Sequence, residues 1–328
     1  MTSEMKLGEI TFAPRSPLNE RTMTPMPTAG RFCWHELMTT DRAGAIKFYG
    51  KLAGWTAEAH PGDPTYQVLI TRSKVRIGGV MDLPQQARQM GSPSHWVPYI
   101  EVTDVDDTVR KATAMGGRTY VSPNDIPNMG RFAILADNQG ATFAVYKGSN
   151  GLSPDDEPGL GEFSWHEMIA GNLDSAWNFY STLFGWEKRE AMDMGEDLGI
   201  YQIYRNAGGT RDLGGMYTKP KDMPGGPHWL CYISVPDAAK SGDYTTQNGG
   251  KVLMGPMEVP GGGHIIGAMD PQGAAFATFQ PPKAMKAAKA KAKPKKKAAK
   301  KKKAPAKKGK VKKKPAKKKA AKKAKRRR

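Results

Sequence analysis

An internal repeat is the feature that most constrains the fold of this 328-residue chain. The segment FCWHELM at 32–38 returns as FSWHEMI at 163–169, which is 131 residues later. The segment DNQG at 137–140 returns as DPQG at 270–273, which is 133 residues later. Because the interval changes so little along the chain, the repeat indicates two copies of one domain with only small differences in loop length.

The repeat predicts one domain at residues 30–148 and a second at 161–280. Residues 149–160 are rich in Gly, Pro, Ser and Asp and are predicted to form the linker between them. Residues 1–29 have no apolar run next to a cleavage site, so we expect a flexible arm and not a secretory signal. Residues 281–328 form a basic tail of Lys, Ala and Pro.

Each copy divides again into two similar halves. In the first copy, Trp34–Thr39 alternates like a strand, and Asp41 is placed to cap a helix that ends near Leu52. Three short strand patterns follow, and then the order restarts with a strand at Val97–Thr103 and a cap at Asp104. The sequence therefore predicts an α+β fold of four βαβββ modules. Paired modules would form two open cups with their helices outside.

This order of elements resembles the vicinal oxygen chelate superfamily, which includes glyoxalase I, bleomycin-resistance proteins and extradiol dioxygenases. The resemblance also rests on Phe-Tyr followed by Gly-Trp in each copy and on the repeated D-x-Q-G turn. It implies two tandem glyoxalase-like domains. Fold alone does not define the activity, because members of one fold carry out different chemistry.

Members of the superfamily that use a metal place His, Gln or Glu seven residues before each helix cap, and Glu near the end of a last strand. The matching positions in this chain are Trp34, Val97, Ala144, Trp165, Leu230 and Ala277. Indole and alkyl side chains offer no lone pair to a metal ion. We therefore expect no cofactor, with a divalent metal only at a displaced site, and this departure argues against metal-dependent lyase or dioxygenase activity.

Other polar and aromatic side chains are predicted to face the cups. The candidate ligand-binding residues are Trp34, Glu36, Tyr99, Arg131, Trp165, Glu167, Tyr232 and His264. The candidate catalytic residues are Glu36, His95, Glu167 and His228, because a Glu–His pair can serve as general acid and base. A purely structural role is the simpler alternative, in which the histidines cap turns and the tryptophans are part of the core.

His35 and His166 are expected on the opposite strand face, toward the helices. A neutral, hydrogen-bonded core histidine is favoured there over a metal ligand. Cys33 and Cys231 lie in different repeats, so we expect no disulfide framework and a reducing compartment, which indicates the cytoplasm.

The tail at 283–328 contains 27 Lys or Arg residues and no acidic residue. The first 282 residues hold 24 basic and 31 acidic residues, so the positive charge of the chain belongs to the tail. We expect the tail to be disordered when free, and its composition resembles the tails of linker histones. Lysines that neutralise phosphates give salt-sensitive, sequence-independent nucleic-acid binding, and the tail lacks aromatic residues for base stacking.

The candidate nucleic-acid contacts are Lys295, Lys296, Lys297, Lys300, Lys301, Lys302, Lys303, Lys312, Lys313, Lys314, Lys317, Lys318, Lys319, Arg326, Arg327 and Arg328. A solubility tail or a contact for acidic proteins is the alternative. Membrane binding is disfavoured because the tail has no apolar face or lipidation motif.

Three functions follow as hypotheses. We favour a bleomycin-resistance-like protein that binds a small apolar or aromatic molecule without metal and is tethered to nucleic acid, in the cytoplasm and on the nucleoid. The alternative is a lyase, isomerase or oxygenase that uses the Glu and His residues of the cups. The third is an architectural protein in which the folded body serves as a homodimer and the tails compact nucleic acid.

Overall fold

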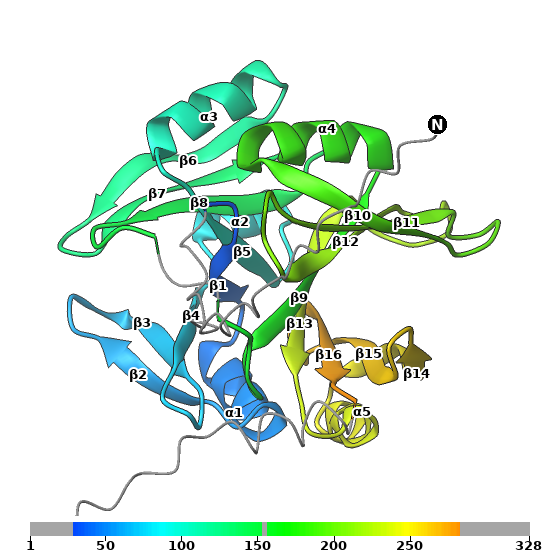
Figure 1. The fold of residues 1–328 in the computed structure, drawn as a ribbon. Coiled ribbons are helices and arrows are strands. Elements are labelled where there is room, and N and C mark those ends of the chain that lie inside the picture. Colours follow the sequence, from blue (N-terminus) through cyan, green and yellow to red (C-terminus); the bar gives the residue numbers. More distant parts are fainter. Residues whose placement is uncertain (1–28, 153–155, 283–328) are drawn as a thin grey trace, which may run out of the picture. The chain divides into compact units, whose positions relative to one another are not determined.

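The computed structural model describes residues 29–152 and 156–282, which form two eight-stranded sheets with helices packed on them (Figure 1). The basic tail and nearly all of the predicted N-terminal arm lie outside the described residues. Within the described ranges, every helix is too short or too polar to cross a membrane.

The first sheet and its helices contain two modules in chain order. The first module consists of β1 (Phe32–Thr39), α1 (Arg42–Leu52), β2 (Thr56–His60), β3 (Asp63–Ile70) and β4 (Arg76–Asp82). A short helix, α2 (Gln85–Gln89), connects it to the second module. That module consists of β5 (His95–Glu101), α3 (Val105–Ala114), β6 (Arg118–Ile126), β7 (Gly130–Ala136) and β8 (Thr142–Gly148).

The second sheet repeats this order. Its first module consists of β9 (Phe163–Ala170), α4 (Leu173–Phe184), β10 (Trp186–Asp193), β11 (Ile200–Asn206) and β12 (Asp212–Thr218). Its second module consists of β13 (His228–Ser234), α5 (Ala238–Gln247), β14 (Lys251–Val259), β15 (Gly263–Met269) and β16 (Ala275–Gln280). The predicted α+β class and the four βαβββ modules are thus confirmed.

The helix starts follow from local capping. The side chain of Asp41 accepts a hydrogen bond from the backbone N–H of Gly44, and that of Asp104 accepts one from Asp107 at 2.9 Å. These bonds satisfy N–H groups that have no partner within the helix. The short helix α2 was not expected from the sequence.

The first strand of each module lies at the centre of its sheet. In the first sheet the strand order is β2-β3-β4-β1-β5-β8-β7-β6, and the second sheet has the equivalent order. Strands β1 and β5 run antiparallel, while β1–β4 and β5–β8 are parallel pairs. Every second side chain on β1, β5, β9 and β13 therefore lies in the middle of the concave face of its sheet.

The helices connect the two domains through shared apolar cores. The core around Phe48 of α1 also includes Phe276 of β16, whose rings meet edge-on with centroids 5.9 Å apart. Phe179 of α4 meets Phe143 of β8 in the same way at 6.1 Å. Each core thus contains side chains from both repeats, and strands β1–β16 belong to one compact unit.

The repeated motifs form reciprocal hydrogen bonds between the domains. The Tyr49 hydroxyl donates to Asp270 at 3.1 Å, and the Tyr180 hydroxyl donates to Asp137 at 3.0 Å. These two aspartates begin the D-x-Q-G turns of the opposite repeats. Because the tyrosines and aspartates are buried, the four side chains specify how one domain docks on the other.

Candidate functional site

A buried carboxyl group lies at the centre of the second cup, which is the concave face of the sheet formed by β9–β16. Glu167 of β9 has 7% of its surface exposed. Its Oε2 accepts a hydrogen bond from the Tyr201 hydroxyl at 2.9 Å and from the Tyr232 hydroxyl at 3.2 Å. Trp165 Nε1 donates to the Tyr201 hydroxyl at 2.9 Å. Trp165, Glu167, Tyr201 and Tyr232 therefore form one connected network of hydrogen bonds.

Strand register brings this network together. Trp165 and Glu167 are two residues apart on β9 and share a face, and Trp165 lies opposite Tyr232 on β13. On the other side of β9, Glu167 lies opposite Gly215 of β12. A Cβ atom at Gly215 would run into the ring of Tyr201. The glycine therefore provides the space in which Tyr201 reaches the carboxylate.

The first cup, on the concave face of the sheet formed by β1–β8, repeats the arrangement. Trp34 Nε1 donates to the Tyr66 hydroxyl at 3.0 Å. Glu36 accepts hydrogen bonds from Tyr66 and Tyr99. Gly79 lies opposite Glu36 on β4, and a Cβ atom there would run into the Tyr66 hydroxyl. Each cup thus holds one glutamate between two tyrosines, and a tryptophan donates a hydrogen bond to one of these tyrosines.

Burial changes the acidity of these two glutamates. Desolvation raises the pKa of Glu36 and of Glu167 from an ordinary value of 4.5 to about 7, although the tyrosine hydrogen bonds act in the opposite direction. Burial is the larger effect because each carboxylate loses its hydration and gains only neutral donors. Near neutral pH each glutamate can therefore accept or donate a proton.

Apolar side chains surround the polar networks. In the first cup they form a packed cluster that includes Met38, Leu83, Val97, Phe132, Ile134 and Ala144. In the second cup the equivalent cluster includes Ile169, Leu198, Tyr217, Leu230, Ile265 and Ala277. An apolar wall with a few oriented polar groups is the usual composition of a small-molecule site.

The structure brings six of the predicted ligand-binding residues together in the cups: Trp34, Glu36, Tyr99, Trp165, Glu167 and Tyr232. Tyr66 and Tyr201 were missed by the sequence reasoning. The signal was present, because both are followed by Gln in corresponding strands of the two repeats.

The two candidate catalytic histidines lie at the ends of the cups. His95 begins β5, and its Nδ1 lies 2.8 Å from the carbonyl oxygen of Pro93. His228 begins β13, and its Nδ1 lies 2.9 Å from that of Gly226. Burial lowers the pKa of both imidazoles. Their described hydrogen bonds go to these turn carbonyls and not to Glu36 or its counterpart, so the structure supports the turn-capping alternative.

Arg131 and His264 line neither cup, and their predicted placement is wrong. Arg131 Nε lies 2.7 Å from Asp106 of α3, and its Nη1 lies 2.9 Å from Asp125. These partners hold it on the helix side of β7. His264 directly precedes Ile265, which lines the second cup, so strand alternation directs His264 to the helix side as well.

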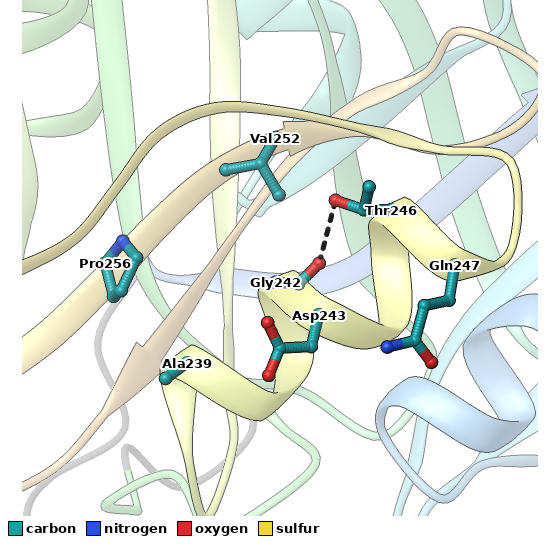
Figure 2. Close-up of a pocket in the computed structure, with 7 residues that line it drawn as sticks. All are labelled: Ala239, Gly242, Asp243, Thr246, Gln247, Val252 and Pro256. Carbon is teal, nitrogen blue, oxygen red and sulfur yellow. Dashed lines mark hydrogen bonds between the residues drawn. The ribbon is translucent and has the colours of Figure 1, made fainter.

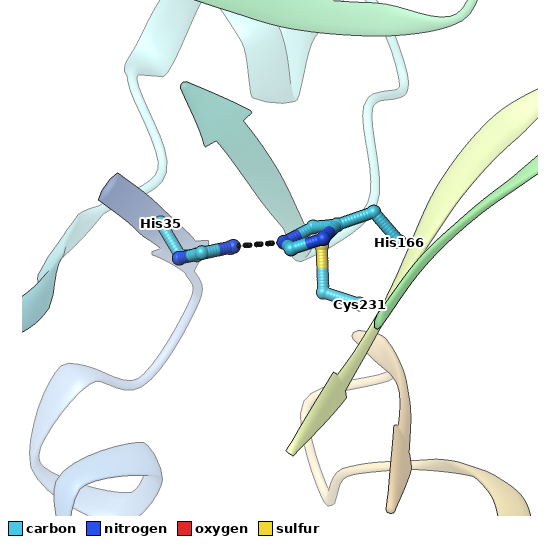
Figure 3. A group of neighbouring side chains, drawn as sticks. All are labelled: His35, His166 and Cys231. Atoms are coloured by element: carbon cyan, nitrogen blue, oxygen red, sulfur yellow. Dashed lines mark hydrogen bonds between the residues drawn. The ribbon is translucent and has the colours of Figure 1, made fainter. Parts of the chain in front are cut away.

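A second group of polar side chains lies between the domains. His35 Nε2 and His166 Nε2 are 2.7 Å apart, and Cys231 Sγ lies with them in a group whose donor atoms are all within 4.8 Å (Figure 3). Phe163 stacks on His35 and Phe32 stacks on His166, with ring centroids 3.7 and 3.6 Å apart. The histidines face the helix side of their strands, as expected, but their contact with each other was not predicted.

A shallow hollow also lies outside the cups, between α5 and β14 (Figure 2). Ala239, Gly242, Asp243, Thr246, Gln247, Val252 and Pro256 line it. Asp243 is its only ionisable side chain. Its polar side chains, Asp243, Thr246 and Gln247, all come from α5.

Paired βαβββ modules in two eight-stranded sheets define the class of fold, and comparison with known proteins identifies the family. Residues 162–278 match the model of the Glyoxalase/Bleomycin resistance protein/Dioxygenase superfamily. The chain is 30% identical to "Putative glyoxylase CFP32" of Mycobacterium tuberculosis over 253 residues, which are 76% of this chain and 94% of that protein. The chain therefore belongs to this superfamily.

Another relative is the anthracycline biosynthesis protein DauV of Streptomyces sp. strain C5, at 28% identity over 79% of this chain and 96% of that protein. Among solved structures, the 2,3-dioxygenase LapB of Pseudomonas sp. KL28 has a TM-score of 0.54 and 14% identity, covering 78% of this chain and 93% of LapB. The Mn(II)-bound glyoxalase of Novosphingobium aromaticivorans has a TM-score of 0.54 and 11% identity, covering 78% of this chain and 83% of that enzyme. These two structures support the fold.

The positions at which the resemblance predicts metal ligands hold side chains without a lone pair for a metal ion. The side chains there are those of Trp34, Val97 and Ala144 in the first cup, and Trp165, Leu230 and Ala277 in the second. Each cup retains one carboxylate, but it is bonded to tyrosines. One shared oxygen donor beside indole and alkyl groups is not a divalent-metal site.

Proposed function

We propose that this chain is a small-molecule-binding protein whose two cups each hold an apolar, aromatic ligand against a buried glutamate. The observation that carries the proposal is the repeated Trp–Tyr–Glu–Tyr network in each aromatic cup. A buried carboxyl group is costly, because desolvation disfavours its charged form. Its presence at the same place in both cups is explained if it contacts a ligand.

The lining of the cups indicates the chemistry of the ligand. Aromatic and aliphatic walls favour a flat, apolar ring system, and the glutamate favours a group that exchanges hydrogen bonds, such as a phenolic hydroxyl. An ionised glutamate accepts a hydrogen bond from a hydroxyl, and a protonated one donates to a carbonyl. Relatives named for anthracycline biosynthesis agree with this class, since anthracyclines are fused-ring molecules with phenols and carbonyls.

The proposal can be tested with quinizarin, a hydroxyanthraquinone, titrated into the full chain by calorimetry. We expect two ligands per chain, one in each cup. Trp165→Ala and Trp34→Ala each remove one aromatic wall and should weaken one site by roughly tenfold or more, since such contacts contribute about 1–2 kcal/mol. Trp177→Ala, on α4 and outside the cups, is the matched control. Unchanged binding in both cup variants would refute the proposal.

The glutamates should make binding depend on pH. If the ligand hydroxyl donates to the ionised carboxylate, affinity rises as pH increases through about 7, the pKa of Glu167. Glu167→Gln keeps the shape of the cup but cannot ionise, so the second cup should lose its pH dependence. A variant that retained the wild-type dependence would show that Glu167 does not contact the ligand.

An enzyme is the second candidate, and the elevated pKa of the two glutamates favours it. A general acid or base works best when its pKa lies near the operating pH, and about 7 meets that condition. The reaction would be a proton transfer in an isomerase, lyase or oxygenase. Under this alternative, Glu36→Gln with Glu167→Gln abolishes turnover while ligand still binds, whereas a binding protein shows no turnover in any variant.

We further propose that the basic tail tethers this cup-bearing body to nucleic acid, on the bacterial nucleoid. The support is the sequence itself, in which 27 positive charges and no negative charge occupy the last 46 residues. A chain that ends at Pro282, just after β16, should lose DNA binding. For the full chain, the logarithm of affinity should fall steeply with the logarithm of salt, because about 0.9 counterion is released per phosphate contacted. Binding that is insensitive to salt, or retained without the tail, would refute the tether.

A further inference from the structure

The group formed by His35, His166 and Cys231 is separate from both cups. On β1, His35 precedes Glu36 and therefore points to the opposite face of the sheet. The two imidazoles have 4% of their surface exposed, and Cys231 has none. The site includes one residue from the first domain and two from the second.

The hydrogen bonds of the two imidazoles cannot all be satisfied by neutral rings. His35 Nδ1 lies 3.4 Å from the carbonyl oxygen of Ile77, and His166 Nδ1 lies 3.4 Å from that of Leu213. If both Nδ1 atoms carry the proton, the two Nε2 lone pairs face each other at 2.7 Å. If one Nε2 carries it, the Nδ1 of that ring presents a lone pair to a carbonyl oxygen.

A cation between the Nε2 atoms resolves this conflict. Both rings can then donate Nδ1–H to a carbonyl, which is the arrangement that orients metal-binding histidines. A proton is a poor candidate, because it would leave a buried positive charge in a group that contains no carboxylate. The thiol of Cys231 supplies a third donor in the same group.

We infer that His35, His166 and the thiolate of Cys231 bind one copper(I) ion between the two domains. Copper(I) is a soft ion that favours thiolate and imidazole ligands. Binding exchanges the thiol proton of Cys231 for the metal, so one proton is released to solvent for each ion bound. Burial raises the pKa of the free thiol, and coordination to the metal overcomes this cost.

Charge and ligand number select copper(I) over zinc. Copper(I) with one thiolate and two neutral imidazoles has no net charge, which suits an apolar enclosure. Zinc would leave one positive charge buried in a group that contains no carboxylate to balance it. Structural zinc sites are almost always four-coordinate, whereas the group described here has three donor residues.

Only a small movement is needed to admit the ion. With metal–imidazole bonds of about 2 Å, two nitrogens at a trigonal centre are about 3.5 Å apart, so the rings must separate by under about 1 Å. The present separation of the Nε2 atoms is 2.7 Å. Phe163 stacks on the His35 ring and Phe32 stacks on the His166 ring, so one face of each imidazole is shielded from water.

The test uses the full, reduced chain without oxygen, incubated with copper(I) in competition with a colorimetric copper(I) chelator. We expect one copper ion per chain, one proton released, and an X-ray absorption spectrum with two nitrogens and one sulfur around the metal. Zinc is titrated in parallel. Preferential binding of zinc by these three ligands would overturn the inference. A copper spectrum without one sulfur and two nitrogens would also overturn it. Both results come from the wild-type chain and do not depend on whether a variant folds.

Two cysteine variants provide a matched comparison. Cys231→Ser should lose the copper, with affinity lowered by at least about a hundredfold, as expected when a soft ligand is removed. Cys33→Ser should retain it, because Cys33 Sγ lies near the carbonyl oxygen of Tyr99, away from the histidines. Copper retained by a folded Cys231→Ser chain would place the metal elsewhere and refute the inference.

Discussion

The buried glutamates should make the protein less stable as the pH rises, and Glu167→Gln should remove part of that loss. The pKa of Glu167 is about 7 in the folded protein and near 4.5 when the chain is unfolded. Between these values the folded state binds more protons than the unfolded state, so the free energy of unfolding falls with increasing pH. The cost is absent below about 4.5 and fully present above about 7.

The magnitude follows from the two pKa values. Each unit of pKa difference corresponds to about 1.4 kcal/mol, so one glutamate contributes a loss of about 3 kcal/mol between acid and mildly alkaline pH. A typical domain has a free energy of unfolding of about 5–15 kcal/mol, so the effect of one cup is easily measured. Glutamine retains a carbonyl oxygen for the tyrosine hydroxyls but cannot ionise.

The assay is urea unfolding of wild-type and Glu167→Gln chains at several values between about pH 5 and pH 8, where the stability difference should grow by about 2.5 kcal/mol. Comparison of the two chains cancels every other titrating group. Glu190→Gln, at an exposed position on β10, controls for the loss of one negative charge. Parallel stability curves for wild type and Glu167→Gln would show that Glu167 has the same pKa in both states, and the reasoning from burial would be wrong.

Two further perturbations test how the site and the interface are assembled. Gly215→Ala should lower the free energy of unfolding by about 2 kcal/mol, because its Cβ would meet the Tyr201 ring. The same substitution should also weaken ligand binding in the second cup. Gly226→Ala is the control, because a Cβ there meets open space, and it should change neither stability nor binding. Tyr180→Phe removes the buried bond to Asp137 and should lower the thermal midpoint by several degrees, equivalent to about 2 kcal/mol. Unchanged stability of the Gly215→Ala chain would contradict the steric argument. An unchanged thermal midpoint of the Tyr180→Phe chain would contradict the interface argument.

The sequence was sufficient to predict the fold because two independent signals agreed. The repeat fixed the number of modules, and the helix caps at Asp41 and Asp104 marked where each βα unit turns. Strand alternation then placed Trp34 and Glu36 on one face of β1, and the structure has both in the first cup. The helix caps and the strand alternation depend only on residues close together in the chain, and the repeat requires only a comparison of the sequence with itself.

The sequence-based predictions failed where they depended on strand register or on residues far apart in the chain. Arg131 was assigned to the first cup, but a one-residue change of register reverses the face of a strand, and ion pairs hold it on the helix side. Tyr66 and Tyr201 reach the glutamates from neighbouring strands, and that approach depends on the space above Gly79 and Gly215. The sequence alone does not give the register between strands, so it does not show that these tyrosines reach the glutamates.

The arrangement of the repeat explains why the cups and the interface can change separately. On β1, Glu36 points into the first cup, while His35 contacts His166 of the second domain across the interface. Substitutions in a cup alter one strand face and leave the docking contacts on the other face in place. The Tyr180–Asp137 bond requires a residue from each repeat, so both copies must keep their interface motifs even if their ligands differ. The separation of the two strand faces therefore allows one fold to carry cups with different linings.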